Sequence, residues 1–284
     1  MDKDTIKTNS HTPQKLITSW NDYKVDPRYF LLLFLASFVT AGQIYLGFFQ
    51  TLDAMIVSVA CTTITELLLV KFLYKKWKFP LSAIISGLGI SLLLSSYALW
   101  PYALASFLAM FFKFFIRFQG GHVFNPNNLA LVIILFFLPE FAVSTPKQWT
   151  NGLGVMITIL ILGLFVTYLA NRLDTVLSFL FGFFIFGLIR HFFFEEPLWS
   201  AIGPIMGASL QLFSFYMITD PKTTPKSRKA RIIFAILVAF VDAIFRNSSI
   251  PNSQFYASFI ISLLFTVPYR YYTKQNTSLL KSHN

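Results

Sequence analysis

Charge is scarce in this chain of 284 residues, of which only 12% are charged and 55% are hydrophobic. Soluble domains carry about 25% charged residues, so this composition argues against an ordinary soluble protein and predicts a polytopic membrane protein. Acidic residues are the scarcest, because 12 Asp and Glu stand against 23 Lys and Arg. Membrane proteins gather Lys and Arg in cytoplasmic loops. The basic excess therefore records topology, and no nucleic-acid partner is expected.

Cysteine is almost absent as well. Cys61 is the one cysteine, so the chain can form no internal disulfide and cannot alone supply the ligands of an iron–sulfur cluster. Its apolar surroundings are typical of a small buried hydrophobic residue. The sequence also carries no Cys/His metal cluster, nucleotide-binding loop or hydrolase triad, which argues against a self-sufficient enzyme of the soluble type.

The first 30 residues lack the apolar core and the cleavage site of a signal peptide. We expect residues 1–28 to form a cytoplasmic tail. A transmembrane domain is then expected over residues 29–270, and a second cytoplasmic tail over residues 271–284.

Apolar runs of spanning length recur through the rest of the chain. A span needs about 20 residues, or fewer where a helix is broken or shielded by protein. Ten candidate spans cover residues 29–49, 52–73, 80–97, 100–117, 128–143, 152–171, 175–194, 198–219, 231–246 and 253–270. The sequence predicts an all-α membrane protein of about ten transmembrane helices, some of them broken. Two halves of five spans would form an inverted repeat, a common device of transporters.

The basic residues predict the orientation. With the N-terminus inside and ten crossings, all but three of the 23 Lys and Arg fall on the inner side; the exceptions are Lys147, Arg190 and Arg246. This strong positive-inside bias predicts a multi-pass protein of the bacterial inner membrane with both termini in the cytoplasm.

The stretch RFQGGHVFNPNNLALVI, residues 117–133, is a polar interruption in the middle of the apolar runs. Pro126 biases the residue before it away from helix, and Asn127 and Asn128 are suited to cap a helix that starts at Leu129. A new helix N-terminus presents free N–H groups and the positive end of the helix dipole. The pattern predicts a broken helix at this point.

A second polar stretch, FYMITDPKTTPKSRKAR at 215–231, is predicted on the same side of the membrane. The two stretches could converge on one cytoplasmic mouth, where His122 and Asn125 could hydrogen-bond a heteroaromatic ring or a carbonyl. The spacing fits equally well a capped turn whose asparagines are satisfied locally. The basic end of the second stretch fits a topology determinant, with an anionic ligand or lipid headgroup as the alternative.

Ionisable residues within the predicted spans are candidates for an ion or proton path, because charge at bilayer depth is costly. Glu66 is the deepest of them. Asp242 has Arg246 four residues further on, at the spacing of a helical ion pair. Lys113 is expected to snorkel toward the surface.

The motif GGHVFNPNNLALV, followed later by FYMITDPKTTP, resembles the paired signatures of RnfD and NqrB. These are membrane subunits of ion-translocating ferredoxin:NAD and NADH:quinone oxidoreductases. The strings ISGLGISLLL and STPKQW look more like stand-alone relatives of RnfD. The resemblance covers roughly residues 80 to 235 and implies a fold of ten transmembrane helices related to urea transporters.

The resemblance also implies a non-covalent flavin, riboflavin or FMN, beside the FNP string. The residues implied as its contacts are Gly121, His122, Phe124, Asn125, Asn128 and Asp220. Asp220 also matches the acid of the TDP motif, which the family ties to cation uptake. With Glu66 and Asp242, it makes up the expected ion pathway.

The sequence departs from the family pattern in one place. It contains no Ser/Thr-Gly-Ala-Thr string, the family's flavinylation motif, and the nearest string is MGAS at 206–209. Covalent FMN is therefore not expected, which removes one electron carrier. Two functions stay open: an electron-transport subunit that works with other membrane redox subunits or a flavoprotein, or a transporter or channel for a flavin or another small solute. A scaffold subunit without its own ligand is a third, weaker alternative, and whether the chain is an enzyme stays open.

Overall fold

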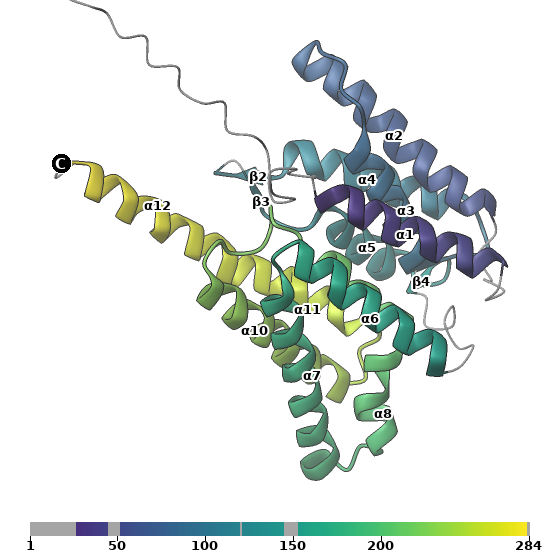
Figure 1. Cartoon of the computed structure of the whole chain (residues 1–284), viewed down its shortest axis with the longest axis vertical. Helices are drawn as coiled ribbons and strands as arrows, with labels where there is room; N and C mark the ends of the chain where they lie inside the picture. The colour runs from purple at the N-terminus through teal and green to yellow at the C-terminus, as the bar shows by residue number, and fades with distance from the viewer. Residues whose placement is uncertain (1–26, 45–51, 120, 145–152, 283–284) are drawn as a thin grey trace, which may run out of the picture.

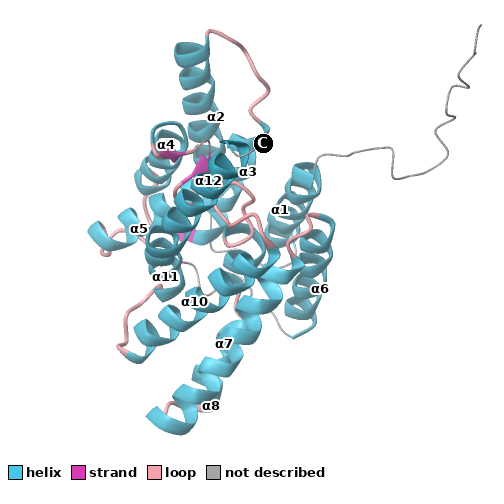
Figure 2. Cartoon of the chain, turned by 90° about the vertical axis from the view of Figure 1, so that its left-hand side faces the viewer, coloured by secondary structure: helices cyan, strands magenta, loops and turns pink. Residues whose placement is uncertain are grey.

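Helices form nearly the whole structure. The computed structural model describes residues 27–44, 52–119, 121–144 and 153–282. Within these ranges the strands are only two residues long (Figure 2), so the all-α prediction is confirmed. The predicted N-terminal tail lies outside the described residues except for its last two positions.

The first half of the chain contains five helices within the described residues. They are α1 (Pro27–Ile44), α2 (Leu52–Tyr74), α3 (Leu81–Leu93), α4 (Trp100–Phe115) and α5 (Pro126–Phe137). Two antiparallel strand pairs accompany them: β1 (Leu94–Ser95) with β4 (Val143–Ser144), and β2 (Arg117–Phe118) with β3 (Gly121–His122).

The second half contains α6 (Leu153–Leu169), α7 (Leu173–Phe194), α8 (Leu198–Ile202), η2 (Gly203–Met206), α9 (Ala208–Leu212), η3 (Phe213–Met217), α10 (Arg228–Asn247), α11 (Ser253–Ile261), η4 (Ser262–Thr266) and α12 (Val267–Ser282). The segment η2 is a 3₁₀-helix, whereas η3 and η4 are π-helical. Each of the ten predicted apolar runs contains a helix, and α12 continues well past the predicted end of the last span.

Two helices in the described part of the chain, α2 and α7, are long and apolar enough to cross a membrane alone. A third span results if the segments Leu198–Met206 and Ser209–Met217, which are bent by 55°, count as one. The remaining apolar helices are shorter. The ten-span topology and the inverted repeat stay predictions.

The helices of each half pack in the same order. In the first half α2 contacts α3 and α4, and α4 contacts α5; in the second half α7 contacts α8 and α10, and α10 contacts α11. Aromatic rings fill the core between the second-half elements. The ring centroid of Phe213 in η3 lies 5.3 Å from that of Phe179 and 5.6 Å from that of Phe255. Figure 1 shows α12 carrying the C-terminus away from this packed body, on a different side from α7 and α8.

Candidate functional site

The two polar stretches meet, which is one of the two arrangements that the sequence left open. The side-chain amide of Asn125 donates to the carbonyl of Met217 at 3.1 Å, and that of Asn127 donates to the hydroxyl of Tyr216. Both acceptors lie in the π-helical segment η3, directly before the second polar turn. Single π-helical turns are frequent at functional sites, and here the turn presents a carbonyl and a phenol to the start of α5.

Arg270 of α12 ties the two stretches to the end of the chain. Its guanidinium donates to the carbonyls of His122 at 2.8 Å, Lys222 at 2.6 Å and Thr223 at 3.0 Å. Gly121 makes this approach possible, because a Cβ there would lie 2.6 Å from Nη1 of Arg270 and 2.9 Å from the Lys222 carbonyl. From the sequence, Arg270 counted only as one of the basic residues on the cytoplasmic side, because no neighbouring residue in the sequence indicated its hydrogen-bond partners.

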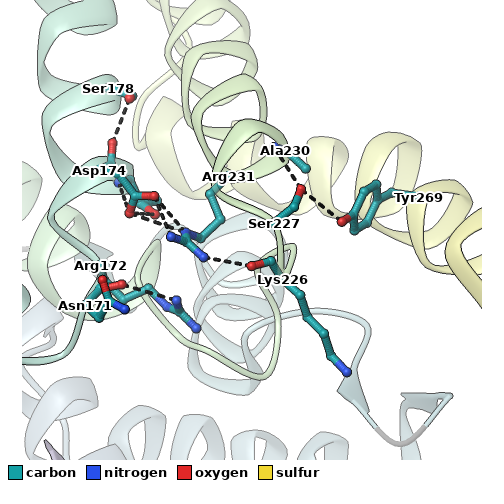
Figure 3. Close-up of polar contacts among 10 residues, drawn as sticks. Asn171, Arg172, Asp174, Ser178, Lys226, Ser227, Ala230, Arg231 and Tyr269 are labelled. Carbon is teal, nitrogen blue, oxygen red and sulfur yellow. Dashed lines mark hydrogen bonds and ion pairs between the residues drawn. The ribbon is translucent and has the colours of Figure 1, made fainter.

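A second tie joins neighbouring loops of the same region (Figure 3). Arg231 of α10 forms an ion pair of 2.6 Å with Asp174 at the start of α7 and donates to the carbonyl of Lys226. Ser227 caps α10, and its hydroxyl also accepts from the phenol of Tyr269 in α12 at 3.1 Å. Sequence reasoning missed this ion pair, because Asp174 and Arg231 are 57 residues apart.

His122 is held in an uncharged form. Its side chain is only 4% exposed, and its Nδ1 has no hydrogen-bond partner among the described residues. Burial, reinforced by the positive charges of Lys222, Arg117, Lys113 and Arg270, lowers the pKa of His122 to about 4. At neutral pH the ring is therefore neutral, with one donor and one acceptor nitrogen.

Asp220 organises its own turn. Its carboxylate accepts the backbone N–H of Lys222 at 3.0 Å, and its carbonyl accepts the N–H and hydroxyl groups of Thr223 and Thr224. Burial raises the pKa of the Asp220 carboxyl, an effect that the Lys222 N–H partly opposes. A proton therefore binds Asp220 more readily than an exposed aspartate.

Asn125, rather than Asn127 or Asn128, caps the broken helix. The helix begins at Pro126, and the Asn125 oxygen accepts the backbone N–H groups of Asn127 at 3.0 Å and Asn128 at 3.3 Å. The prediction of a start at Leu129 with Asn127 and Asn128 as caps was wrong, because proline favours the first helical position and its predecessor then becomes the cap. Both the oxygen and the nitrogen of the Asn125 side-chain amide are therefore hydrogen-bonded.

Asn127 and Asn128 point into the protein instead. Their Nδ2 groups donate to the carbonyls of Ser86 and Phe255, each at 3.1 Å. Their Oδ1 atoms, and both polar atoms of the Gln211 amide, have no partner among the described residues, although all three side chains are at most 1% exposed. Buried amides are nearly always hydrogen-bonded, so these three side chains are exceptions among the described residues.

Phe124 connects the first polar stretch to the second half of the chain. Its ring stacks on that of Phe259 in α11, with centroids 4.8 Å apart and planes inclined by 24°. An aromatic pair beside a neutral histidine is a surface on which a planar heteroaromatic group could lie.

Glu66 is part of a closed polar triad between α2, α3 and α4. Its carboxylate pairs with Nζ of Lys113 at 2.7 Å, and both groups contact the hydroxyl of Ser82. Lys113 is only 8% exposed, so the expectation that it snorkels to the surface was wrong: the ion pair holds it inside.

Asp242 and Arg246 form the predicted helical ion pair at 2.8 Å. Ser253 donates to the other carboxylate oxygen of Asp242 at 2.6 Å, while Arg246 donates to Gln254 at 3.0 Å. Gln254 in turn donates to Ser209, the last residue of the MGAS string. Among the described residues, no three His, Cys, Asp or Glu side chains lie close enough together to hold a metal ion.

The long apolar helices α2 and α7 fit a membrane protein. Residues 149–277 match the model of the NQR2, RnfD, RnfE family. The comparison with curated proteins found no match. The matched region contains the FYMITDPKTTP stretch and Arg270, whereas the GGHVFNPNN stretch precedes it. This match supports the RnfD/NqrB resemblance that the sequence motifs indicated.

Proposed function

We propose that this protein is an electron-transport subunit that holds a non-covalent flavin, riboflavin or FMN, at a mouth formed by residues 117–125 and 218–225. The family match supports a membrane subunit of the RnfD, NqrB or RnfE type. The observation that carries the flavin proposal is the neutral, buried His122 at the contact between the two polar stretches.

The residues of the mouth suit such a ligand. A neutral imidazole can donate to a flavin carbonyl or accept from the ring N–H, and the stacked Phe124 offers an aromatic surface. Gly121 allows Arg270 and the Lys222 carbonyl to pack against the hairpin that carries His122. The flavin would supply the redox chemistry, while the chain would fix its position and electrostatics. Asn125 acts indirectly in this arrangement, by starting α5 at the correct place.

The electrons would come from other subunits. Without a flavinylation motif, the chain offers a single carrier, so a donor and an acceptor must be other membrane redox subunits or a flavoprotein. Coupling to a cation would rest on Asp220, because Glu66 and Asp242 are held in ion pairs of 2.7 and 2.8 Å. We place the mouth on the cytoplasmic side, since basic loops that the positive-inside rule assigns there contact one another through Arg270 and Arg231.

The test is the absorption spectrum of the purified full-length protein, with mass analysis of any extracted flavin. We expect a yellow protein that loses most of its flavin on His122→Ala. His191→Ala is the matched control, because His191 lies near the far end of α7 and bonds the Glu196 carbonyl. A colourless wild-type protein, or a His122→Ala variant that keeps its flavin, would contradict the proposal.

A transporter or channel is the second candidate. The unpartnered buried amides of Asn127, Asn128 and Gln211 favour it, because broken helices that present polar groups inside a bundle also suit transport. Uptake of a flavin or small polar solute into proteoliposomes without any redox partner would support transport. Loss of uptake on Gln211→Met, with flavin content unchanged, would separate the two functions.

A further inference from the structure

Basic side chains from four separate segments surround His122. Arg117 is its direct partner across the β2–β3 hairpin. Lys222 lies in the turn that Arg270 fastens to the His122 carbonyl. Lys113, at the end of α4, is the fourth positive charge that acts on the ring. Up to 148 residues of sequence separate these groups from His122.

Most of this charge is not neutralised. Lys113 is balanced by its carboxylate partner, but no ion pair among the described residues includes Arg117, Lys222 or Arg270. Asp220 is the nearby acid, and one of its oxygens is already bound to the Lys222 N–H. The charges of Lys222 and Arg172 act on Asp220, and Asp220 acts on Arg270, so positive charge is in excess around this carboxylate.

The cluster also has unused donors. Arg117 uses Nε to bond the Lys113 carbonyl at 3.0 Å, while its two terminal nitrogens and the ammonium of Lys222 make no hydrogen bond within the described part of the chain. Both side chains are exposed, and the buried Nδ1 of His122 is unpartnered there too. Arginine forks and ammonium groups are the usual ligands of phosphate oxygens.

We propose that Arg117, His122 and Lys222 bind the phosphate group of a phosphate ester. These three residues and Arg270, which holds their segments together, are called the basic mouth. Two sources carry this chemistry: the headgroup of an anionic phospholipid, which reaches basic sites at a membrane face, and the phosphate of a soluble ligand such as FMN. The inference goes beyond the proposed function, because a phosphate can be bound there with or without a flavin.

The soluble source is tested by titrating the full-length protein, in nanodiscs of phosphatidylcholine alone, with FMN and with riboflavin. These ligands differ only in the phosphate. We expect FMN to bind about tenfold more tightly, the factor that one charge-assisted hydrogen bond supplies. The preference should disappear in the double variant Arg117→Gln, Lys222→Gln.

The lipid source is tested by native mass spectrometry of the same protein, purified from detergent with phosphatidylglycerol and phosphatidylcholine present in equal amounts. Here we expect phosphatidylglycerol to be retained selectively by the wild-type protein and lost from the double variant. The matched control is Arg228→Gln, Lys229→Gln, which removes the same charge from exposed positions in the first turn of α10.

The proposal is supported if the double variant loses the preference for FMN or the retention of phosphatidylglycerol while the α10 control keeps it. The experiment in which the loss occurs shows whether the phosphate comes from a soluble ligand or from a lipid. The proposal is overturned if wild-type and double variant agree in both arms, or if the α10 control loses as much. If the wild-type protein binds neither FMN nor riboflavin, the proposed flavin function is contradicted. The phosphate site is then tested by the lipid experiment alone.

Discussion

The pair of Glu66 and Lys113 gives the sharpest prediction. Both side chains are 11% exposed and their charged atoms are 2.7 Å apart. Lys113→Met keeps the apolar stem but removes the ammonium, which leaves the carboxylate with only the Ser82 hydroxyl. Removing one partner of a buried pair costs about 3–5 kcal/mol of the free energy of unfolding. The double variant Glu66→Leu, Lys113→Met should recover most of that loss, because neither charge is then stranded.

The measurement is the free energy of unfolding of the purified protein in mild detergent, for both single variants and the double variant. A stabilising role of the pair is contradicted if Lys113→Met lowers the free energy of unfolding by less than about 1 kcal/mol, or if the double variant is as unstable as Lys113→Met. A stable double variant that has lost cation-coupled activity would identify Glu66 as part of an ion path in addition to its structural role.

Three further outcomes follow from the mouth. The folded-state pKa of His122, about 4, lies below the usual 6.5. The free energy of unfolding should therefore decrease as the pH falls from about 7 toward 4, because the unfolded chain then binds a proton that the folded chain does not. Thermal unfolding of His122→Gln should lack this pH-dependent contribution. Asn125→Ala should cost at least about 1 kcal/mol by loss of the helix cap. Asn125→Asp should keep the cap but lose the donor to the Met217 carbonyl, so its stability should lie between those of the alanine variant and the wild type in the same unfolding assay. Gly121→Ala should displace Arg270 and cost about 1–3 kcal/mol; unchanged flavin content and stability would refute the close approach.

Sequence reasoning predicted the helices well, because a membrane span must be a long apolar run that satisfies its own backbone. The count of crossings put the two polar stretches on one side, which allowed them to meet but did not decide between a shared site and two separate turns. The start of α5 was misplaced by three residues. The pair Asn125-Pro126 already indicated the correct start of the helix, because it is a cap residue followed by a first-turn proline. Asn127 and Asn128 also suit a cap, and taking them as caps gave the incorrect start at Leu129.

The polar ties could not be predicted in the same way. Glu66 and Lys113 are 47 residues apart, and Asp174 and Arg231 are 57 apart. A basic residue near a span end looks the same in sequence whether it faces solvent, as Lys222 does, or braces three carbonyls, as Arg270 does. Partner choice of this kind depends on how helices from both halves pack, which periodicity does not report.

The brace by Arg270 has a consequence for biosynthesis. Chains grow from the N-terminus at about 5–20 residues per second, and 148 residues separate His122 from Arg270. Roughly 7 to 30 seconds therefore pass between synthesis of the hairpin and synthesis of the residue that fastens it. During that interval the first half can insert, but the mouth is incomplete. Any ligand of this site is consequently bound only after Arg270 has been synthesised.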